Sequence, residues 1–375
     1  MRFYYDYSTM VKWTGTPTGI PRVVYCLANE LRHIVKEFYL VTIDDELKTF
    51  HHVEALEDGE FSVGNPVSFA PGDVLFTAGA HWAFACYYNE IRRLKSIGIH
   101  FSQLSYDIIP DLFPYFYDVG VAFGDYFGRV VIENLALCDS SFAISECSRN
   151  DIIARSQREN IDTSRMMVVR LGEDFWFGTP VAADISLDEK GFLLCVGTLE
   201  IRKNQALLLN AYRILSARYP GRLPKLIFVG RKGWIDGEIA FQISNDRALN
   251  GLVEVLQGVS DAALDWLYSN CLFTLFPALY EGWGLPIAES LRHGKPCISS
   301  NTSSMVEIAP ELTIFASPYS AEAWADQIER LVFQPGILAA QAEKIVREYK
   351  PTKWRDTAAS IYTAIASIAP NMRDK

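Results

Sequence analysis

The stretch that most constrains the fold is an apolar run that leads through a glycine-rich turn into a helix. Residues 272–276 are the apolar run, which stops at Pro277 as a buried parallel strand would. Pro286 and the residues after it predict a helix that ends before Gly294. The turn between strand and helix would present backbone N–H groups and the positive end of a helix dipole, which together favour an anion.

Two carboxylates flank this turn. Glu281 lies on the loop at the carboxyl end of the expected strand, and Glu289 lies about one turn inside the expected helix. A phosphate bound by the turn would have a carboxylate on each side, and each could accept hydrogen bonds from sugar hydroxyls. Two glutamates at this spacing are also common as solvated or salt-bridged acids, but the strand, turn and helix around them favour a binding site.

The length of the chain and its cysteines limit the class of protein. With 375 residues, the chain can hold two domains with separate cores. We expect no membrane span because no apolar run is long enough, and no signal peptide because Asp6 interrupts the first apolar residues. The seven cysteines are scattered, which favours buried free thiols in a reducing, cytoplasmic compartment, and no Cys/His spacing indicates a metal site.

The charge restricts the partners. A formal net charge of −10 disfavours nucleic acid. Residues 1–175 hold 15 Lys and Arg against 24 Asp and Glu, and this acidity disfavours strong adsorption to an anionic membrane. A weak peripheral contact with a lipid carrier at the inner face of the plasma membrane stays open through Trp13, Trp82 and residues 113–116. A homo-oligomer also stays open.

Expected strands alternate with expected helices in both halves, which predicts an α/β protein with doubly wound parallel sheets. The first domain is expected over residues 1–178, a linker over 179–190 and the second domain over 191–351. An amphipathic helix within 352–375 is expected to return to the first domain. Ligands of such sheets bind at the carboxyl ends of the strands, so the cleft between the two domains is the expected active site.

Two cations follow the first strand of the second half. Arg202 and Lys203 are expected at the start of a helix, after a strand over 191–197. Cations at a helix N-terminus oppose the helix dipole, so a bound anion between them would explain their position. The alternative is a solvated charged turn.

The first half offers two weaker candidates. Gly19 lies in a polar loop between the first strand and a helix, where it could form a tight connection or let the backbone approach a ligand. Asp107 closes the strand expected over 100–106. From the residues alone we favour a helix cap or loop anchor over a catalytic role for Asp107.

With these residues taken together, the chain resembles the retaining glycosyltransferases of family four, which have the GT-B fold of two Rossmann-like domains. The pair Glu281 and Glu289, with Gly-Leu-Pro between them, is similar to the family signature. Residues 197–204 resemble its donor-phosphate segment and residues 258–261 its nucleotide-side loop. Residues 18–22, 145–148 and 171–172 fit more loosely.

The resemblance implies a nucleotide-sugar donor, no metal and no other cofactor. Arg202 and Lys203 would neutralise the leaving diphosphate, Glu281 would hold hydroxyls of the donor sugar, and Glu289 would accept hydrogen bonds from the ribose. The other donor-binding residues that it implies are Gly284, Leu285, Pro286, Gly19, Val259 and Gly230.

One departure from the family concerns the first half. Many relatives have His-Asp where this chain has Tyr106-Asp107. Either one of these residues takes over the role of the histidine or the role is dispensable, and the resemblance makes Asp107 a catalytic candidate. In the front-face mechanism of the family, the leaving phosphate takes the proton of the acceptor, so no protein base is required.

We therefore expect a retaining hexosyltransferase of polysaccharide biosynthesis that moves mannose from GDP-mannose to a glycan or lipid-linked saccharide. Residues 197–204 favour this donor because they look most like those of bacterial polysaccharide mannosyltransferases. UDP-glucose, UDP-galactose and UDP-GlcNAc stay open as donors. A GT-B phosphorylase would need a lysine context for pyridoxal phosphate that we do not find, and an epimerase or a catalytically idle GT-B binding protein are further alternatives.

Overall fold

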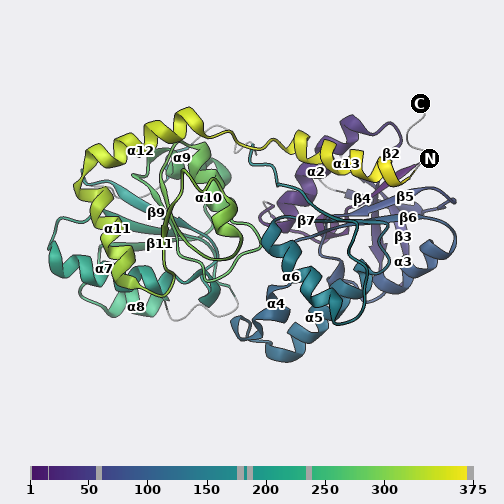
Figure 1. Cartoon of the computed structure of the whole chain (residues 1–375), viewed down its shortest axis with the longest axis horizontal. Helices are drawn as coiled ribbons and strands as arrows, with labels where there is room; N and C mark the ends of the chain where they lie inside the picture. The colour runs from purple at the N-terminus through teal and green to yellow at the C-terminus, as the bar shows by residue number, and fades with distance from the viewer. Residues whose placement is uncertain are drawn as a thin grey trace. The chain divides into compact units, whose positions relative to one another are not determined.

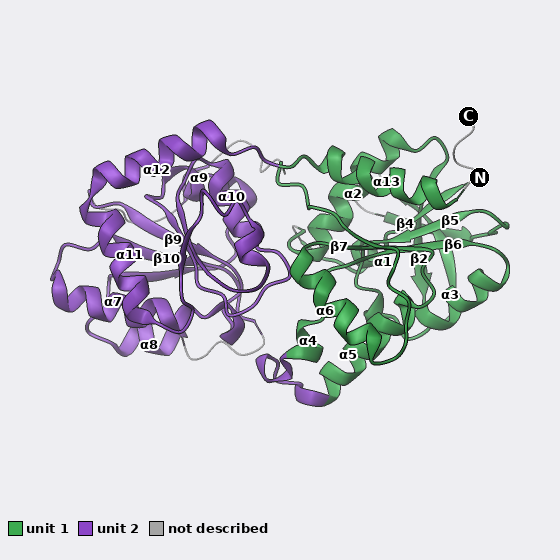
Figure 2. Cartoon of the chain, in the orientation of Figure 1, with its two compact units in different colours: residues 1–112, 122–175, 352–375 green, residues 113–121, 176–351 purple. Residues whose placement is uncertain are grey.

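The computed structural model describes residues 2–15, 17–55, 61–174, 181–183, 189–233 and 239–369. The chain divides into two compact units, each with its own β-sheet (Figure 2). Unit 1 comprises Met1–Leu112, Ala122–Phe175 and Thr352–Lys375, and unit 2 comprises Phe113–Val121 and Trp176–Pro351.

The sheet of unit 1 has eight strands in the order β4-β3-β2-β1-β5-β6-β7-β8. The strands from β2 to β8 in this order pair in parallel, whereas β3 and β4 add an antiparallel edge. The bounds are β1 Phe3–Asp6, β2 Phe38–Asp44, β3 Thr49–Ala55, β4 Phe61–Pro66, β5 Val74–Thr77, β6 His100–Ser105, β7 Ser140–Ala143 and β8 Met166–Val168.

The antiparallel edge was not predicted from the sequence. Strand β4 is largely exposed, so its residues need neither an apolar run nor a clean alternation. A two-stranded antiparallel edge on an otherwise parallel sheet is common in doubly wound proteins, and the predicted α/β class with doubly wound sheets is confirmed.

Helices cover both faces of this sheet. Tyr4 of β1 belongs to a buried cluster with Ile91 of α3, whereas the hydroxyl of Tyr5 donates to the carbonyl oxygen of Val24 in α2 at 3.0 Å. The helices of unit 1 are α1 Ser8–Val11, α2 Ile20–Ile34, α3 Tyr87–Ser96, α4 Ile109–Leu112, α6 Glu146–Gln157, α13 Trp354–Ile368 and, apart from its first two residues, α5 Gly120–Leu135.

The last helix, α13, returns to unit 1 as predicted and lies beside α2 (Figure 1). The Trp354 backbone N–H donates to Oδ1 of Asp174 at 2.7 Å, and the Thr357 hydroxyl donates to the carbonyl oxygen of Arg170 at 2.7 Å. These bonds fix the start of α13 against the segment that leaves β8.

The sheet of unit 2 has six strands in the order β11-β10-β9-β12-β13-β14, and all of their pairings are parallel. The strands are β9 Phe192–Val196, β10 Lys225–Val229, β11 Val253–Leu256, β12 Thr274–Phe276, β13 Cys297–Ser300 and β14 Ile314–Ala316. The helices are α7 Gln205–Arg218, α8 Ile239–Asn245, α9 Asp261–Asn270, α10 Leu285–Arg292, α11 Ala321–Phe333 and α12 Pro335–Glu348.

Both faces of this second sheet are also buried. In β9, Leu193 joins a buried cluster with Leu208 of α7, whereas Leu194 joins a different cluster with Tyr268 of α9. A strand that is buried on both faces reads as a continuous apolar run, which explains why the strands of this unit could be located from the sequence.

One segment of the predicted first domain is grouped with the other unit. Residues 113–121 fall within the predicted first domain but are grouped with unit 2, where the rings of Phe113 and Tyr280 pack with centroids 4.7 Å apart. Of the predicted linker 179–190, only residues 181–183 and 189–190 are among the described residues.

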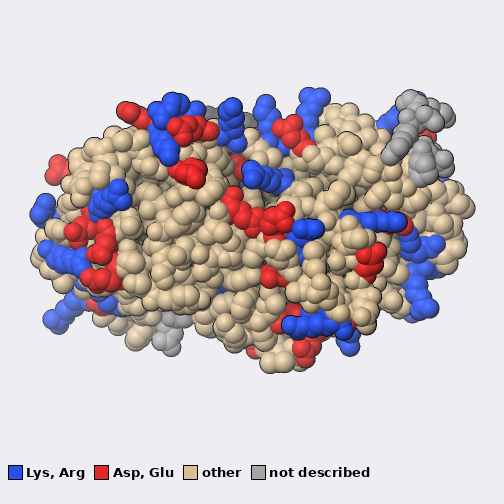
Figure 3. All heavy atoms as spheres, viewed as in Figure 1, with Lys and Arg blue, Asp and Glu red and all other residues tan. Residues whose placement is uncertain are grey.

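Two surface properties bear on partners. Among the helices of the described residues, none is both long and apolar enough to cross a membrane. On the face drawn in Figure 3, Lys and Arg of the described residues are interspersed with Asp and Glu.

Candidate functional site

The strongest candidate residues lie on two neighbouring loops of unit 2. Arg202 and Lys203 end a short 3-10 helix, η3 Ile201–Lys203, which follows β9. Glu281 lies on the loop that follows β12, and β12 is the neighbour of β9 in the sheet. The carboxyl ends of parallel strands meet at one edge of the sheet, so the topology brings these three residues together.

Their side chains form a buried ion-paired cluster. Oε2 of Glu281 lies 2.8 Å from Nη1 of Arg202, and Oε1 lies 2.6 Å from Nζ of Lys203. Nη2 of Arg202 donates to Oε1 of Glu200 at 2.8 Å, and its Nη1 also donates to the carbonyl oxygen of Tyr280 at 3.0 Å. The four charged side chains are between 9% and 16% exposed, so water screens them little.

The cluster fixes the charge of its members. Burial alone would raise the pKa of Glu281, but Arg202 and Lys203 outweigh it and lower the pKa below its ordinary value. Burial alone would lower the pKa of Arg202, but Glu281 and Glu200 outweigh it and raise the pKa above its ordinary range. Glu281 is therefore ionised at neutral pH, where it can accept hydrogen bonds but is a poor proton donor.

The formal charges of the cluster cancel, with two carboxylates opposite two cations. The sequence predicted Arg202 and Lys203 as phosphate contacts, and it did not predict that Glu200 and Glu281 would pair with them. An incoming phosphate would have to share these cations with the two carboxylates.

Three consecutive hydroxyl residues after β13 brace the loop that carries Glu281. The Ser304 hydroxyl shares its proton between the carbonyl oxygens of Glu281 at 2.8 Å and Trp283 at 2.7 Å. Oγ of Ser303 accepts from the Glu281 backbone N–H at 3.0 Å, and the Thr302 hydroxyl donates to the carbonyl oxygen of Leu279 at 3.1 Å. Sequence reasoning missed these residues, and their only signal was a Thr-Ser-Ser run after a strand.

Asn204 joins three of the loops. It follows η3 in the left-handed conformation, with φ of 59°, which asparagine tolerates better than most residues. Its Nδ2 donates to the carbonyl oxygens of Pro277, after β12, and of Pro318, after β14, at 3.0 Å each. The loops after β9, β12 and β14 are thus held by a single amide.

The glycine-rich turn leads into α10 as predicted. Gly284 has φ of 134°, and a Cβ there would lie 3.1 Å from side-chain atoms of Ile287 and Ile308, so the position favours glycine. Helix α10 starts at Leu285, and Pro286 occupies its first turn, where a missing N–H costs no hydrogen bond.

Glu289 is the fifth residue of α10 and is 7% exposed. Its Oε2 accepts a hydrogen bond from the Tyr268 hydroxyl at 2.7 Å, and its carbonyl oxygen lies 2.7 Å from Nδ1 of His293. The sequence predicted Glu289 but neither of these partners.

Two further predicted donor residues have structural explanations of their own. A Cβ on Gly230 would lie 2.0 Å from the carbonyl oxygen of Gly197, so the loops after β10 and β9 touch through their backbones there. Val259 is half-buried and packs against the apolar cluster that contains Leu267 and Tyr268.

The remaining candidates belong to unit 1. Oδ1 of Asp107 accepts from the Ile109 backbone N–H at 3.0 Å, two residues further on, which is an Asx turn that leads into α4. Tyr106 is buried and its hydroxyl donates to the carbonyl oxygen of Ala78 at 2.6 Å, so this hydroxyl already has a partner. Gly19 immediately precedes α2, with φ of 57°.

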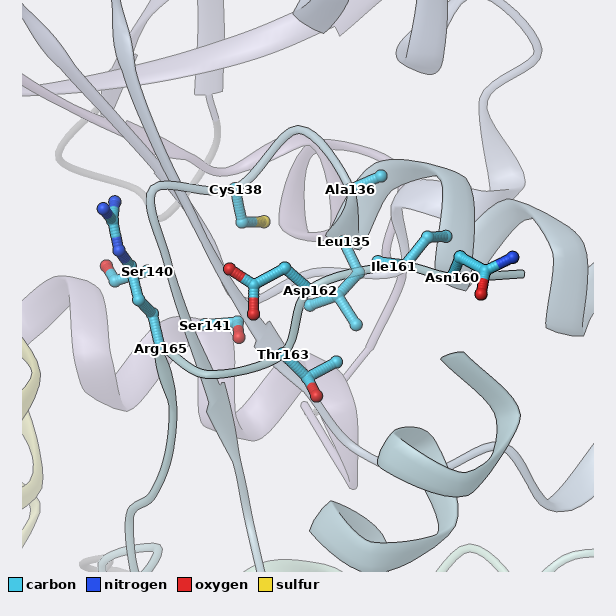
Figure 4. Close-up of a pocket in the computed structure, with 10 residues that line it drawn as sticks. All are labelled: Leu135, Ala136, Cys138, Ser140, Ser141, Asn160, Ile161, Asp162, Thr163 and Arg165. Carbon is cyan, nitrogen blue, oxygen red and sulfur yellow. The ribbon is translucent and has the colours of Figure 1, made fainter. Parts of the chain in front are cut away.

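The part of the chain that the structure describes holds no group of three or more His, Cys, Asp or Glu side chains that could bind a metal ion. A cavity of about 310 Å³ in unit 1 is lined by Ser140, Ser141, Asp162 and Thr163 among others (Figure 4). No candidate residue lines it, so we assign it no part in the site.

Most of the second unit matches a family model. Residues 183–349 match the family model described as glycosyl transferases group 1. O-antigen chain mannosyltransferase B of Escherichia coli is 30% identical over 205 residues, which are 53% of this chain and 52% of that protein. D-inositol 3-phosphate glycosyltransferase of Rhodococcus jostii is 24% identical over 256 residues, which are 60% and 57% of the two chains. These matches span little more than half of each relative's own length.

Solved structures match the fold of nearly the whole chain. Sucrose-phosphate synthase from Thermosynechococcus elongatus matches with a TM-score of 0.72 over 99% of this chain and 100% of that chain, at 15% identity. HepE from Anabaena, solved in complex with UDP and glucose, matches with a TM-score of 0.67 over 98% and 100%, also at 15% identity. At this identity the likeness establishes the fold alone.

The chain therefore has the GT-B fold, and most of its second unit matches the family of glycosyl transferases group 1. Within that class, its sequence resembles bacterial mannosyltransferases, including serotype-specific mannosyltransferase WbdA of Escherichia coli at 30% identity over 180 residues, which are 45% of this chain and 22% of that protein. The resemblance predicted from residues 197–204 and from the two glutamates is confirmed at this level.

Proposed function

We propose that the protein is a retaining hexosyltransferase that moves mannose from GDP-mannose to a glycan or lipid-linked saccharide without a metal ion. The observation that carries this proposal is the buried cluster of Arg202, Lys203 and Glu281 at the carboxyl ends of β9 and β12. In doubly wound sheets, ligands bind outside these ends.

The two cations suit a leaving nucleoside diphosphate. Negative charge builds up on the diphosphate as the bond to the sugar breaks, and fixed cations in a buried site stabilise that charge strongly. Arg202 and Lys203 are already oriented by their carboxylate partners, so little reorganisation would be needed when the diphosphate arrives. This arrangement supports the proposal that the two side chains neutralise the leaving diphosphate, as a metal ion does in other transferases.

Glu281 is better suited to binding the donor sugar than to acid–base catalysis. Its lowered pKa makes it a weak base, while its ionised oxygens are strong acceptors for sugar hydroxyls. A weak protein base agrees with front-face transfer, in which the leaving phosphate takes the proton of the acceptor hydroxyl. The bond from the anomeric carbon to the phosphate oxygen breaks, and the bond to the acceptor oxygen forms on the same face.

Two nucleotide-sugars are candidates for the donor. The names of the bacterial mannosyltransferases support mannose, and GDP-mannose is the donor that we expect from residues 197–204. HepE, solved with UDP and glucose, supports a UDP-hexose as the second candidate.

The test is a screen of GDP-mannose, UDP-glucose, UDP-galactose and UDP-GlcNAc by thermal shift and by donor hydrolysis in the absence of an acceptor. We expect GDP-mannose to raise Tm most and to be hydrolysed slowly, and Glu281→Ala to abolish hydrolysis. If a UDP-hexose raises Tm more than GDP-mannose does and is hydrolysed faster, that UDP-hexose is the donor. Binding without any turnover would favour a catalytically idle protein, and unaltered turnover in Glu281→Ala would remove the cluster from the site.

A further inference from the structure

Glu289 is held at two points by one neighbouring helix, α9. The Tyr268 hydroxyl donates to Oε2 of the Glu289 carboxylate at 2.7 Å. The second contact runs through His293, whose Nδ1 lies 2.7 Å from the Glu289 carbonyl oxygen and whose Nε2 lies 2.9 Å from Oδ1 of Asp265. Asp265 and Tyr268 are three residues apart on α9, so they lie on the same side of that helix.

The partners of Glu289 are themselves firmly placed. Tyr268 is fully buried in an apolar cluster, and its ring stacks on that of His293 with centroids 5.1 Å apart and an interplanar angle of 17°. A buried hydroxyl needs a hydrogen-bond partner, and the Glu289 carboxylate supplies it. The tyrosine therefore fixes the orientation of the carboxylate, and the carboxylate in turn fixes the tyrosine hydroxyl.

The direction of this hydrogen bond does not change near neutral pH. Burial, and then the charge of Glu289, raise the pKa of Tyr268 well above its ordinary value. The hydroxyl thus keeps its proton and donates it, which is the form that stabilises an ionised carboxylate.

We propose that Tyr268 is a positioning residue for nucleotide recognition, because its hydroxyl holds the Glu289 carboxylate in the orientation that accepts hydrogen bonds from the donor ribose. His293 and Asp265 support the backbone of the same residue. This inference rests on the proposed function and on the ribose contact that the family resemblance implies for Glu289. A ribose is common to GDP and UDP sugars, so the effect of Tyr268 is independent of which base the enzyme selects.

The test compares Tyr268→Phe with a matched control, Tyr212→Phe. Tyr212 is also fully buried in unit 2, on α7, but its hydroxyl donates to a backbone acceptor, the Pro224 carbonyl oxygen, at 3.4 Å. For each variant, KM and kcat are measured with the donor that the screen selects, and the Kd of the matching nucleoside diphosphate is measured by calorimetry. Tm is recorded for both variants as a check on folding.

We expect Tyr268→Phe to raise donor KM and the diphosphate Kd about tenfold, with kcat within about twofold, because a contact equal in ground and transition states affects binding alone. Tyr212→Phe should change neither constant, even if its Tm falls as much. In a Glu289→Ala background, Tyr268→Phe should have no further effect, since it acts through that carboxylate.

Three results would overturn the inference while the proposed function stands. They are an unchanged KM in Tyr268→Phe, an equal rise in KM in the two tyrosine variants, and a full effect of Tyr268→Phe in the Glu289→Ala background. If the wild-type protein neither binds nor turns over any nucleotide-sugar, the proposed function fails and the inference fails with it.

Discussion

The substitution Glu281→Gln tests the ion-paired cluster most directly, because it removes one charge and keeps the shape of the side chain. Two ion pairs of 2.8 and 2.6 Å, to Arg202 and Lys203, would lose their electrostatic attraction. Removal of one partner from a buried pair costs about 3–5 kcal/mol. We expect the lower end, about 3 kcal/mol, because Arg202 keeps Glu200 and a glutamine oxygen still accepts a hydrogen bond.

The assay is thermal unfolding followed by calorimetry. For a unit of this size, about 3 kcal/mol corresponds to a fall in Tm of about 6–12 °C. The control is Glu254→Gln, whose ion pair with Lys225 is 3.5 Å long and whose side chain is 37% exposed. A pair this exposed contributes less than about 1 kcal/mol. If Glu281→Gln lowers Tm no more than Glu254→Gln does, the cluster is not the buried network described here.

The same variant separates a phosphate site from a purely structural cluster. In Glu281→Gln the formal charge of the cluster changes from zero to +1, so the leaving diphosphate competes with one carboxylate fewer. We expect GDP to bind about tenfold more tightly and to raise Tm more than in the wild type, while kcat/KM for transfer falls about 100-fold. A GDP affinity that is unchanged or weaker would refute the assignment of Arg202 and Lys203 to the diphosphate.

Four further predictions follow from the same contacts. Glu289→Ala should raise donor KM with little change in kcat, which steady-state kinetics would reveal; an unchanged KM would remove it from the ribose site. EDTA should leave the transfer rate unaltered, and a loss that added Mg²⁺ or Mn²⁺ restores would contradict metal independence. Asp107→Asn should keep both the hydrogen bond from the Ile109 N–H and the transfer rate, whereas Asp107→Ala should cost about 1 kcal/mol of stability; a large fall in kcat in the asparagine variant would instead point to catalysis. Because the folded-state pKa of Glu281 is lowered, its contribution to stability is present above pH 4.5, its ordinary value, and is lost as pH falls below it, so acid unfolding should be shallower in Glu281→Gln.

The parts of the site that follow from local sequence were predictable. Strand β12, the turn at Gly284 and helix α10 are specified by an apolar run, glycine and proline within about twenty residues. The buried strands of unit 2 were found for the same reason. Strand β4 was not, because an exposed edge places few demands on residue type. Strand β3, which lies between β4 and β2, was missed as well.

The contacts that set the chemistry depend on the tertiary fold. Glu200 and Arg202 are two residues apart, but the pairing of Arg202 with Glu281 depends on the adjacency of β9 and β12. Tyr268 is 21 residues from Glu289, and Ser304 is 23 residues from Glu281, so no local pattern links them. Asp107 could be read either as a cap or loop anchor or as a catalyst, and its bond to the Ile109 N–H is a loop-anchoring contact.

Asn204 has a consequence for engineering. One side-chain amide bonds the loops after β12 and β14 from its own place after β9. The three loops are therefore not independent modules, and an exchange of any one of them with a relative to alter donor preference would have to preserve both carbonyl acceptors and the left-handed backbone of Asn204. A chimera that replaces all three loops together should fold better than one that replaces the loop after β9 alone.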